Sequence, residues 1–214
     1  VGSVWCEVSG GDVYFTGGRG IGIHYLNGVM RVSGSSLEVT HKSSMFNGSA
    51  FHGSVFHINY LYVIGGLKSI GMRECERLSV SEDRWETLKP LPLGGYGVSV
   101  VVVNETQCLF VLGGYNCIDD LELVQRLSLG RLEWDVLPIR LPSAGSFIAS
   151  FNQDKSRVGF VARGQLYFLN VLTECSINLI KHVGDIQSSS GPSYYFRGCL
   201  HCSNNNGAAK SLMM

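Results

Sequence analysis

The stretch Leu-Tyr-Val-Ile-Gly-Gly at residues 61–66 decides the fold, because the chain contains three stretches built in the same way. Each is a short apolar run that stops at a pair of glycines, and 48 residues separate one pair from the next. The glycine pairs are Gly17-Gly18, Gly65-Gly66 and Gly113-Gly114. Such runs are typical of buried β-strands that end in a turn. Self-similarity at this period predicts a propeller or a solenoid array.

A second marker repeats with nearly the same period. An Arg-Leu-Ser triplet begins at Arg77 and again at Arg126, and a tryptophan follows each arginine after 8 residues, at Trp85 and Trp134. A Leu-Pro dipeptide follows each tryptophan, at 91–92 and 141–142. Since a large side chain that recurs once per unit is what packing between sheets requires, we expect both tryptophans in the core.

Composition narrows the class of protein. The 214 residues carry 17 basic and 17 acidic side chains, and only 16% of residues are charged against 45% that are apolar. This balance excludes a solvated disordered chain and argues against a nucleic-acid binder, which would carry a basic cluster. No apolar stretch is long enough for a membrane span. The 27 glycines disfavour helices and favour the turns of an all-β protein.

Each period predicts four short strands. We expect them at 4–7, 13–16, 29–32 and 37–40 in the first unit, and at 53–57, 61–64, 74–80 and 84–88 in the second. The third unit predicts strands at 98–103, 108–112, 124–129 and 133–137, and a degenerate fourth unit predicts them at 158–164, 166–171 and 176–180. The expected blades are 1–48, 49–97, 98–146 and 147–184, with 185–214 as a partial fifth blade or a disordered tail.

An apolar strand ending in Gly-Gly, a tryptophan about 20 residues later and then Leu-Pro together resemble the kelch repeat, best between residues 51 and 142. The resemblance implies an all-β, kelch-type propeller of about four four-stranded blades. The first unit departs from the pattern, because Leu37 stands near the position of the tryptophan. Since kelch-like propellers generally have six or seven blades, and since Val1 opens the chain without Met, we expect an incomplete ring and a piece of a longer chain.

The sequence predicts no catalytic, cofactor or metal site. The run Gly17–Gly22 could be taken for a phosphate cradle, but no helical pattern follows it. Cys199, His201 and Cys202 have the right side chains for zinc but lack a second ligand pair nearby. We expect the repeated Arg77 and Arg126 to form hydrogen bonds or ion pairs between blades, and the plausible acceptors are Glu76, Glu82, Glu133 and Asp135.

Function is expected in the loops that join strand two to strand three and strand four to the next blade, because these emerge on one face of a propeller. The candidate partner-binding residues there are Arg19, His24, Tyr25, Lys68, Arg73, Tyr96, Tyr115, Asn116, Asp119, Asp120 and Arg140. The main hypothesis is a non-catalytic module that binds a partner protein, and the resemblance implies roles such as substrate receptor for ubiquitin ligation or cytoskeletal scaffold. Two alternatives stay open, namely a kelch-like propeller enzyme of oxidase or sugar isomerase type and a divergent fragment without independent function.

The seven cysteines are odd in number and irregularly spaced, which argues against a disulfide framework and favours a cytoplasmic location. The oligomeric state and the identity of the partner stay open.

Overall fold

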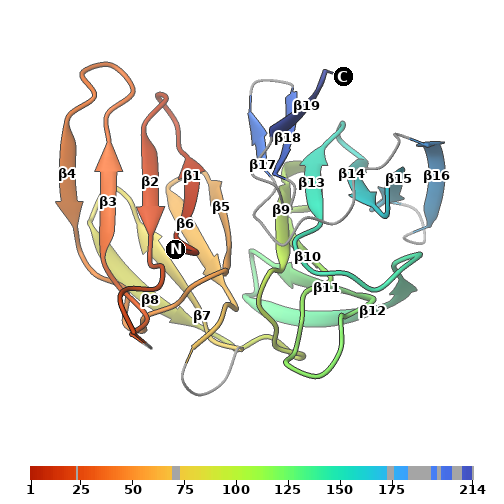
Figure 1. Cartoon of the computed structure of the whole chain (residues 1–214), viewed down its shortest axis with the longest axis horizontal. Helices are drawn as coiled ribbons and strands as arrows, with labels where there is room; N and C mark the ends of the chain where they lie inside the picture. The colour runs from red at the N-terminus through yellow and green to blue at the C-terminus, as the bar shows by residue number, and fades with distance from the viewer. Residues whose placement is uncertain are drawn as a thin grey trace. The chain divides into compact units, whose positions relative to one another are not determined.

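The computed structural model describes residues 1–22, 24–68, 73–172, 176–182, 194–196, 199–203 and 209–213. Its strands form four four-stranded antiparallel sheets and one three-stranded sheet, and in each sheet the strands lie in chain order (Figure 1). The prediction of an all-β fold with four four-stranded blades is therefore confirmed. In this part of the chain no helix has the length and apolarity that a membrane crossing requires.

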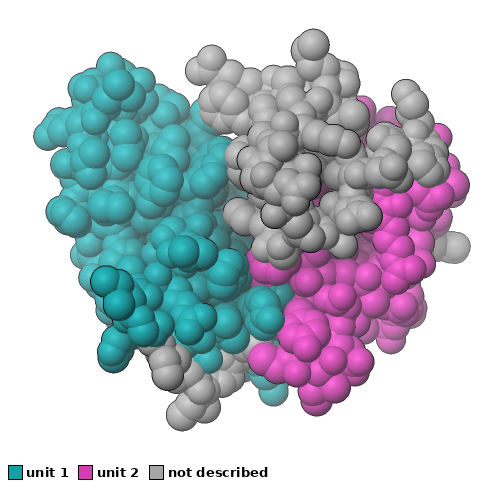
Figure 2. Space-filling view, viewed as in Figure 1, with its two compact units in different colours: residues 1–96 teal, residues 97–214 magenta. Residues whose placement is uncertain are grey.

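The chain divides into two compact units, Val1–Tyr96 and Gly97–Met214, which Figure 2 distinguishes by colour. The first blade of unit 1 consists of β1 (Val4–Glu7), β2 (Val13–Thr16), β3 (Val29–Val32) and β4 (Val39–Lys42). Its second blade consists of β5 (Gly53–His57), β6 (Tyr60–Ile64), β7 (Cys75–Ser79) and β8 (Arg84–Leu88).

Unit 2 holds the third blade, the fourth blade and the three-stranded sheet. The third blade contains β9 (Ser99–Val103), the 3₁₀ turn η1 (Asn104–Thr106), β10 (Cys108–Leu112), β11 (Leu123–Ser128) and β12 (Glu133–Arg140). The fourth contains β13 (Ala149–Asn152), β14 (Arg157–Ala162), β15 (Gln165–Asn170) and β16 (Ile177–His182), and β17 (Tyr194–Phe196), β18 (Cys199–Ser203) and β19 (Ala209–Met213) follow.

One predicted strand begins late for a reason that the structure makes plain. The sequence predicts a strand from residue 37, but β4 begins at Val39 because Leu37 adopts a left-handed backbone with φ of 58° in the preceding turn. Leu37 is 74% exposed, so it does not take the core position that tryptophan holds in the next blade.

Each unit buries an apolar core between its two four-stranded blades. In unit 1, Tyr14 and Val29 of the first blade pack in one cluster with Leu61, Leu78 and Trp85 of the second. In unit 2, residues of β10 and β11 pack in one cluster with residues of β14 and β15. Because burial of one such side chain contributes about 1.5–3 kcal/mol, these clusters account for much of the cohesion between neighbouring blades.

The glycine pairs fix the link between one blade and the next. All six glycines have positive φ, between 60° and 117°, a backbone conformation that other residues rarely adopt. The second glycine of each pair donates its N–H to a carbonyl of the segment that leads out of the blade. These bonds join Gly18 to Ser49 (2.8 Å), Gly66 to Gly95 (3.0 Å) and Gly114 to Gly145 (2.9 Å).

The repeated tryptophans and arginines play different structural roles. Trp85 is 6% exposed and its Nε1 donates to the carbonyl of Ser43 across 2.7 Å, which ties β8 to the segment after β4, whereas Trp134 is half-buried. The arginines pair within a blade, Arg77 with Glu86 and Arg126 with Asp135, each across 2.8 Å.

The prediction of ion pairs between blades was wrong for these two contacts. Strand register places Arg77 directly opposite Glu86 and Arg126 directly opposite Asp135. Side chains at directly opposed positions are close neighbours, so each arginine meets a carboxylate in its own sheet. Of the four acceptors that we expected, Asp135 is used in this way.

Candidate functional site

The antiparallel order of each blade places the loops between strands two and three at one end of the sheet, together with the segment after strand four. The opposite end carries the turns between strands one and two. All the candidate partner-binding residues lie at the first end, in the β2–β3, β6–β7 and β10–β11 loops, at the end of β12 and in the segment after β8. The structure divides these candidates into two groups. Some lie in loops with exposed tips, and the side chains of others contact the rest of the protein.

The β2–β3 loop of the first blade is closed at its neck and exposed at its tip. Arg19 and Tyr25 form an isolated antiparallel bridge, and the Arg19 N–H donates to the Val1 carbonyl across 2.7 Å. The Arg19 side chain bonds within the loop, from Nε to the Gly22 carbonyl (3.2 Å). At the tip, Ile21 is 100% exposed, and His24 is exposed beside it.

The β10–β11 loop of the third blade has the same construction. Tyr115 and Asp120 form the bridge at its neck. The Asn116 side-chain oxygen accepts from the N–H groups of Ile118 (2.9 Å) and Asp119 (2.8 Å), which fixes the turn at the tip. Ile118 is 79% exposed, and Asp119 and Asp120 are exposed as well.

Four other candidates contact the protein itself. The Lys68 side chain is only 7% exposed and lies 3.6 Å from Glu74, and Arg73 Nε donates to the Leu91 carbonyl across 2.6 Å. Arg140 donates to the carbonyls of Leu137 and Ile139, and the ring centroid of Tyr96 lies 6.2 Å from that of Phe51. These side chains hold the loops and linkers in place.

Sequence reasoning missed the two isoleucines at the loop tips. A signal was present for Ile21, because an isoleucine between Gly20 and Gly22 in a turn cannot belong to a strand. Ile118 lies in a polar loop beside Asp119 and carries the same signal. The sequence does not show how exposed either side chain is, because exposure depends on how the rest of the loop folds.

Buried polar groups in unit 1 serve the packing of its two blades. His52 is 3% exposed and its Nε2 lies 2.7 Å from Thr16 Oγ1. Burial, and next the charge of Lys68, lower the pKa of His52 to about 3, so the ring is neutral at neutral pH. Glu76 is also 3% exposed, and its carboxylate accepts from the N–H groups of Phe46 (2.8 Å) and Asn47 (3.4 Å).

The half-buried thiol of Cys6 and the buried thiol of Cys75 are not activated. Burial raises the pKa of Cys6 and of Cys75 to about 12, so both remain protonated at neutral pH, and a protonated thiol is a poor nucleophile. Among the described side chains, no three His, Cys, Asp or Glu groups are placed to hold a metal ion. Cys199, His201 and Cys202 lie in β18, whose side chains fall outside that description.

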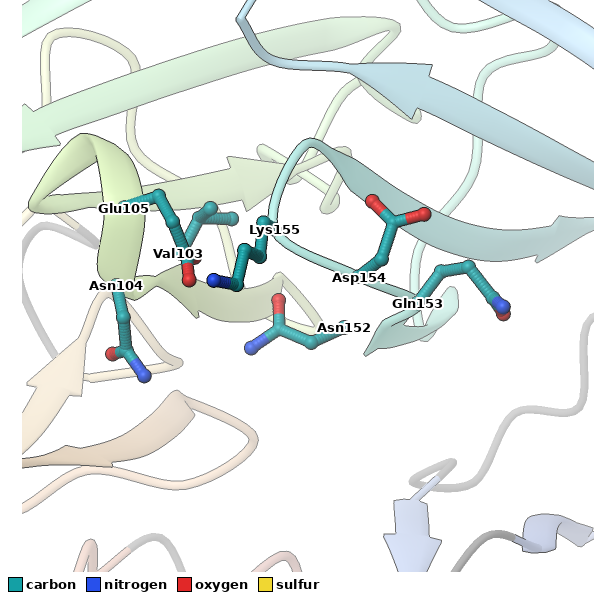
Figure 3. Close-up of a pocket in the computed structure, with 7 residues that line it drawn as sticks. All are labelled: Val103, Asn104, Glu105, Asn152, Gln153, Asp154 and Lys155. Atoms are coloured by element: carbon teal, nitrogen blue, oxygen red, sulfur yellow. The ribbon is translucent and has the colours of Figure 1, made fainter.

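A pocket of about 270 Å³ lies at the other end of unit 2, between the β9–β10 and β13–β14 turns (Figure 3). In Figure 3 the Glu105 and Lys155 side chains extend toward one another, whereas Gln153 and Asp154 point away from them. The residues that line the pocket are Val103, Asn104, Glu105, Asn152, Gln153, Asp154 and Lys155. The sequence did not predict this pocket, because its two walls are turns almost 50 residues apart.

Comparison with known proteins agrees with the fold and with the repeat. The kelch motif family matches residues 49–92. A kelch repeat-containing protein of Dictyostelium discoideum is 35% identical over 83 residues, which cover 37% of this chain and 12% of that protein. This chain therefore spans a small part of that relative.

A similarity in structure covers far more of the chain. The solved structure of YjhT matches with a TM-score of 0.71 and 14% sequence identity, over 94% of this chain and 72% of that one. At this low identity the match bears on the fold alone.

Proposed function

Since this chain is a kelch-repeat protein, we propose that it is a non-catalytic interaction module that binds a partner protein through the loops between strands two and three of its blades. The observation that carries the proposal is an isoleucine at the tip of two such loops, Ile21 with 100% and Ile118 with 79% of its surface exposed.

An exposed isoleucine at a loop tip gains little from the fold of its own chain. Its burial against a partner would contribute about 1.5–3 kcal/mol, so it is suited to be an anchor in an interface. In both loops a bridge closes the neck, Arg19 with Tyr25 and Tyr115 with Asp120. Preorganised loops lose less conformational entropy on binding, which supports this assignment.

Charged and polar groups beside each isoleucine supply the rim of such an interface. His24 is exposed next to Ile21, and Asp119 and Asp120 are exposed next to Ile118. A central apolar anchor with a polar rim is the usual anatomy of a protein interface. The finer part of the proposal, an adaptor or scaffold role in the cytoplasm, rests on the resemblance to kelch proteins.

The test is quantitative pull-down from a cell lysate with the whole chain as bait. The double variant Ile21→Ser with Ile118→Ser removes both anchors, and Ile58→Ser is the matched control. Ile58 is 73% exposed and lies in the β5–β6 turn, at the end of the second blade that carries no candidate loop. Because Ile21, Ile118 and Ile58 are all exposed, we expect the free energy of unfolding of each variant to stay within about 0.5 kcal/mol of that of the native chain.

The double variant should lose proteins that both the native chain and the Ile58→Ser control retain, with about a tenfold or greater loss of recovery. Equal recovery by the double variant would refute the assignment of the loops. If Ile58→Ser lost the same proteins to the same extent, the capture would be due to nonspecific hydrophobic adsorption. This result would also refute the assignment of the loops.

A further inference from the structure

The pocket of unit 2 lies at the end of the blades that carries no candidate loop, so the proposed protein-binding function does not use it. One wall is η1 (Asn104–Thr106) between β9 and β10, and the other is the β13–β14 turn. Its volume of about 270 Å³ lies just below the range of about 300–1,000 Å³ that is usual for drug-sized ligands. The pocket is therefore suited to a small molecule.

Two opposite charges in the pocket are available to a ligand. The Glu105 and Lys155 side chains come from different walls and extend toward one another (Figure 3). Neither forms an ion pair or a side-chain hydrogen bond with another residue in the described part of the chain. Asp154 differs, because Arg157 Nε lies 2.6 Å from its carboxylate and the pKa of Asp154 is lowered to about 2 by this contact and by Ser156.

The rest of the lining is mostly amide. Asn152 donates from Nδ2 to the Val102 carbonyl across 2.5 Å, which holds the side chain in place and leaves its Oδ1 as an acceptor. Asn104 and Gln153 add two more side-chain amides, and Val103 is the single apolar residue of the lining. A ligand with a large hydrocarbon part has little to contact here.

From these contacts we propose that the pocket binds a small zwitterion of the amino-acid class. The ligand carboxylate pairs with Lys155, its ammonium group pairs with Glu105, and Asn152 Oδ1 accepts a further ammonium hydrogen. A lone cation would meet Lys155 and a lone anion would meet Glu105, so each would suffer a like-charge contact that the zwitterion avoids. A neutral sugar would leave both charges without partners.

The test is a titration of the whole isotope-labelled chain followed by NMR amide shifts, with L-alanine as the probe. Acetate and methylammonium each carry one of the two charges, and glucose carries neither. We expect saturable shifts at Glu105 and Lys155 with L-alanine, and at least about tenfold weaker binding of the three other compounds.

Three variants distinguish a specific site from a polar surface. Glu105→Gln and Lys155→Gln should each weaken L-alanine binding at least about tenfold. The exchange Glu105→Lys with Lys155→Glu keeps both charges and should restore binding to within about threefold, with the ligand reversed. Arg131→Gln is the control, because the Arg131 side chain is 71% exposed and lies outside the pocket.

Absence of saturable shifts with L-alanine, or glucose binding of equal strength, would overturn the proposal. Unchanged binding in both single variants would do the same. None of these outcomes bears on Ile21 and Ile118, since the loop tips lie at the other end of their blades.

Discussion

Gly113 shows why a glycine pair ends the second strand of a blade. Its φ is +62°, and a Cβ atom built on it would lie 2.2 Å from the Gly145 carbonyl oxygen, a backbone atom that cannot move away alone. We predict that Gly113→Ala lowers the free energy of unfolding by at least about 1–3 kcal/mol, the cost of such backbone strain.

The matched control for this prediction is Gly130→Ala. A Cβ at Gly130 would meet nothing within 4 Å. Urea denaturation should therefore show a change within about 0.5 kcal/mol for this variant. Equal effects of the two substitutions would contradict the role assigned to the glycine pair.

His52 makes the stability of the protein depend on pH. Its pKa is about 3 in the folded chain, against about 6.5 for an unperturbed histidine, which an unfolded chain would approach. Between these values the unfolded chain binds the proton more tightly, so the free energy of unfolding falls as the pH falls from about 6.5 toward 3. The raised pKa of Glu76 acts in the opposite direction, and the effect of His52 must therefore be measured as a difference.

We predict that His52→Leu loses less stability than the native chain when the pH is lowered from about 7.5 to about 5. Urea denaturation at both pH values measures this difference. His41→Gln is the comparison variant, because it replaces a histidine that is exposed on β4. The same pH dependence in His52→Leu and in the native chain would rule out the role of His52.

At the level of single residues, the sequence predicted the turns at the glycine pairs but not the burial of His52. A glycine pair that recurs at a fixed interval has a local cause, the turn after a strand. The burial of His52 has a distant one, because Gly17 and Gly66, in two different blades, lie close to its side chain. No pattern in the neighbourhood of residue 52 contains that information.

At the scale of strands and segments, Trp85 makes both a packing contact and a hydrogen bond. The two interactions contribute differently to the free energy of unfolding. Trp85→Phe removes only the bond from Nε1 to the Ser43 carbonyl and should cost about 0.5–1.5 kcal/mol, since Ser43 is exposed and water can replace the donor. Trp85→Ala also removes a ring that is 6% exposed and should cost about 3–5 kcal/mol. The midpoint of urea denaturation measures both, and similar losses for the two variants would show that the hydrogen bond dominates.

Strand positions were predictable and the partners of side chains were not. The strands at 53–57, 84–88 and 108–112 have the predicted bounds, because β-branched, aromatic and other apolar residues in each are flanked by turn residues. Arg77 pairs with Glu86 rather than with another blade, because register decides which carboxylate lies opposite. The pocket beside Glu105 was not predicted either, because it forms only when two turns that are distant in the sequence come together.

For the whole molecule, we predict a far-UV circular dichroism spectrum dominated by β-sheet. Within the described ranges the one helical segment is η1, of three residues. A double minimum typical of α-helix would contradict the fold, and the spectrum of the Ile21→Ser with Ile118→Ser variant should match that of the native chain.

At this scale the repeat made the kelch-type fold predictable, whereas the side chains exposed at the loop tips were not. The interval of the repeat and the residues that form turns can be recognised directly in the sequence, because they have local structural causes. The exposure of Ile21 and Ile118 arises only after folding, and so does the lack of an ion-pair partner for Lys155 among the residues that the structure describes. Lys68 and Arg73 form contacts within the protein. The sequence alone does not distinguish such residues from residues whose side chains are exposed to solvent.

The hydrogen bond from the second glycine of each pair also bears on how such a protein can diversify. Gly18 anchors the base of the β2–β3 loop to Ser49, and the bridge between Arg19 and Tyr25 closes its neck. Among residues 20–22 and 24, which the structure describes beyond that neck, none forms a backbone hydrogen bond that joins one blade to the next. Foreign peptides grafted at the tip, or insertions acquired there by a gene over time, could therefore change the binding specificity while the architecture of the blades is inherited unaltered.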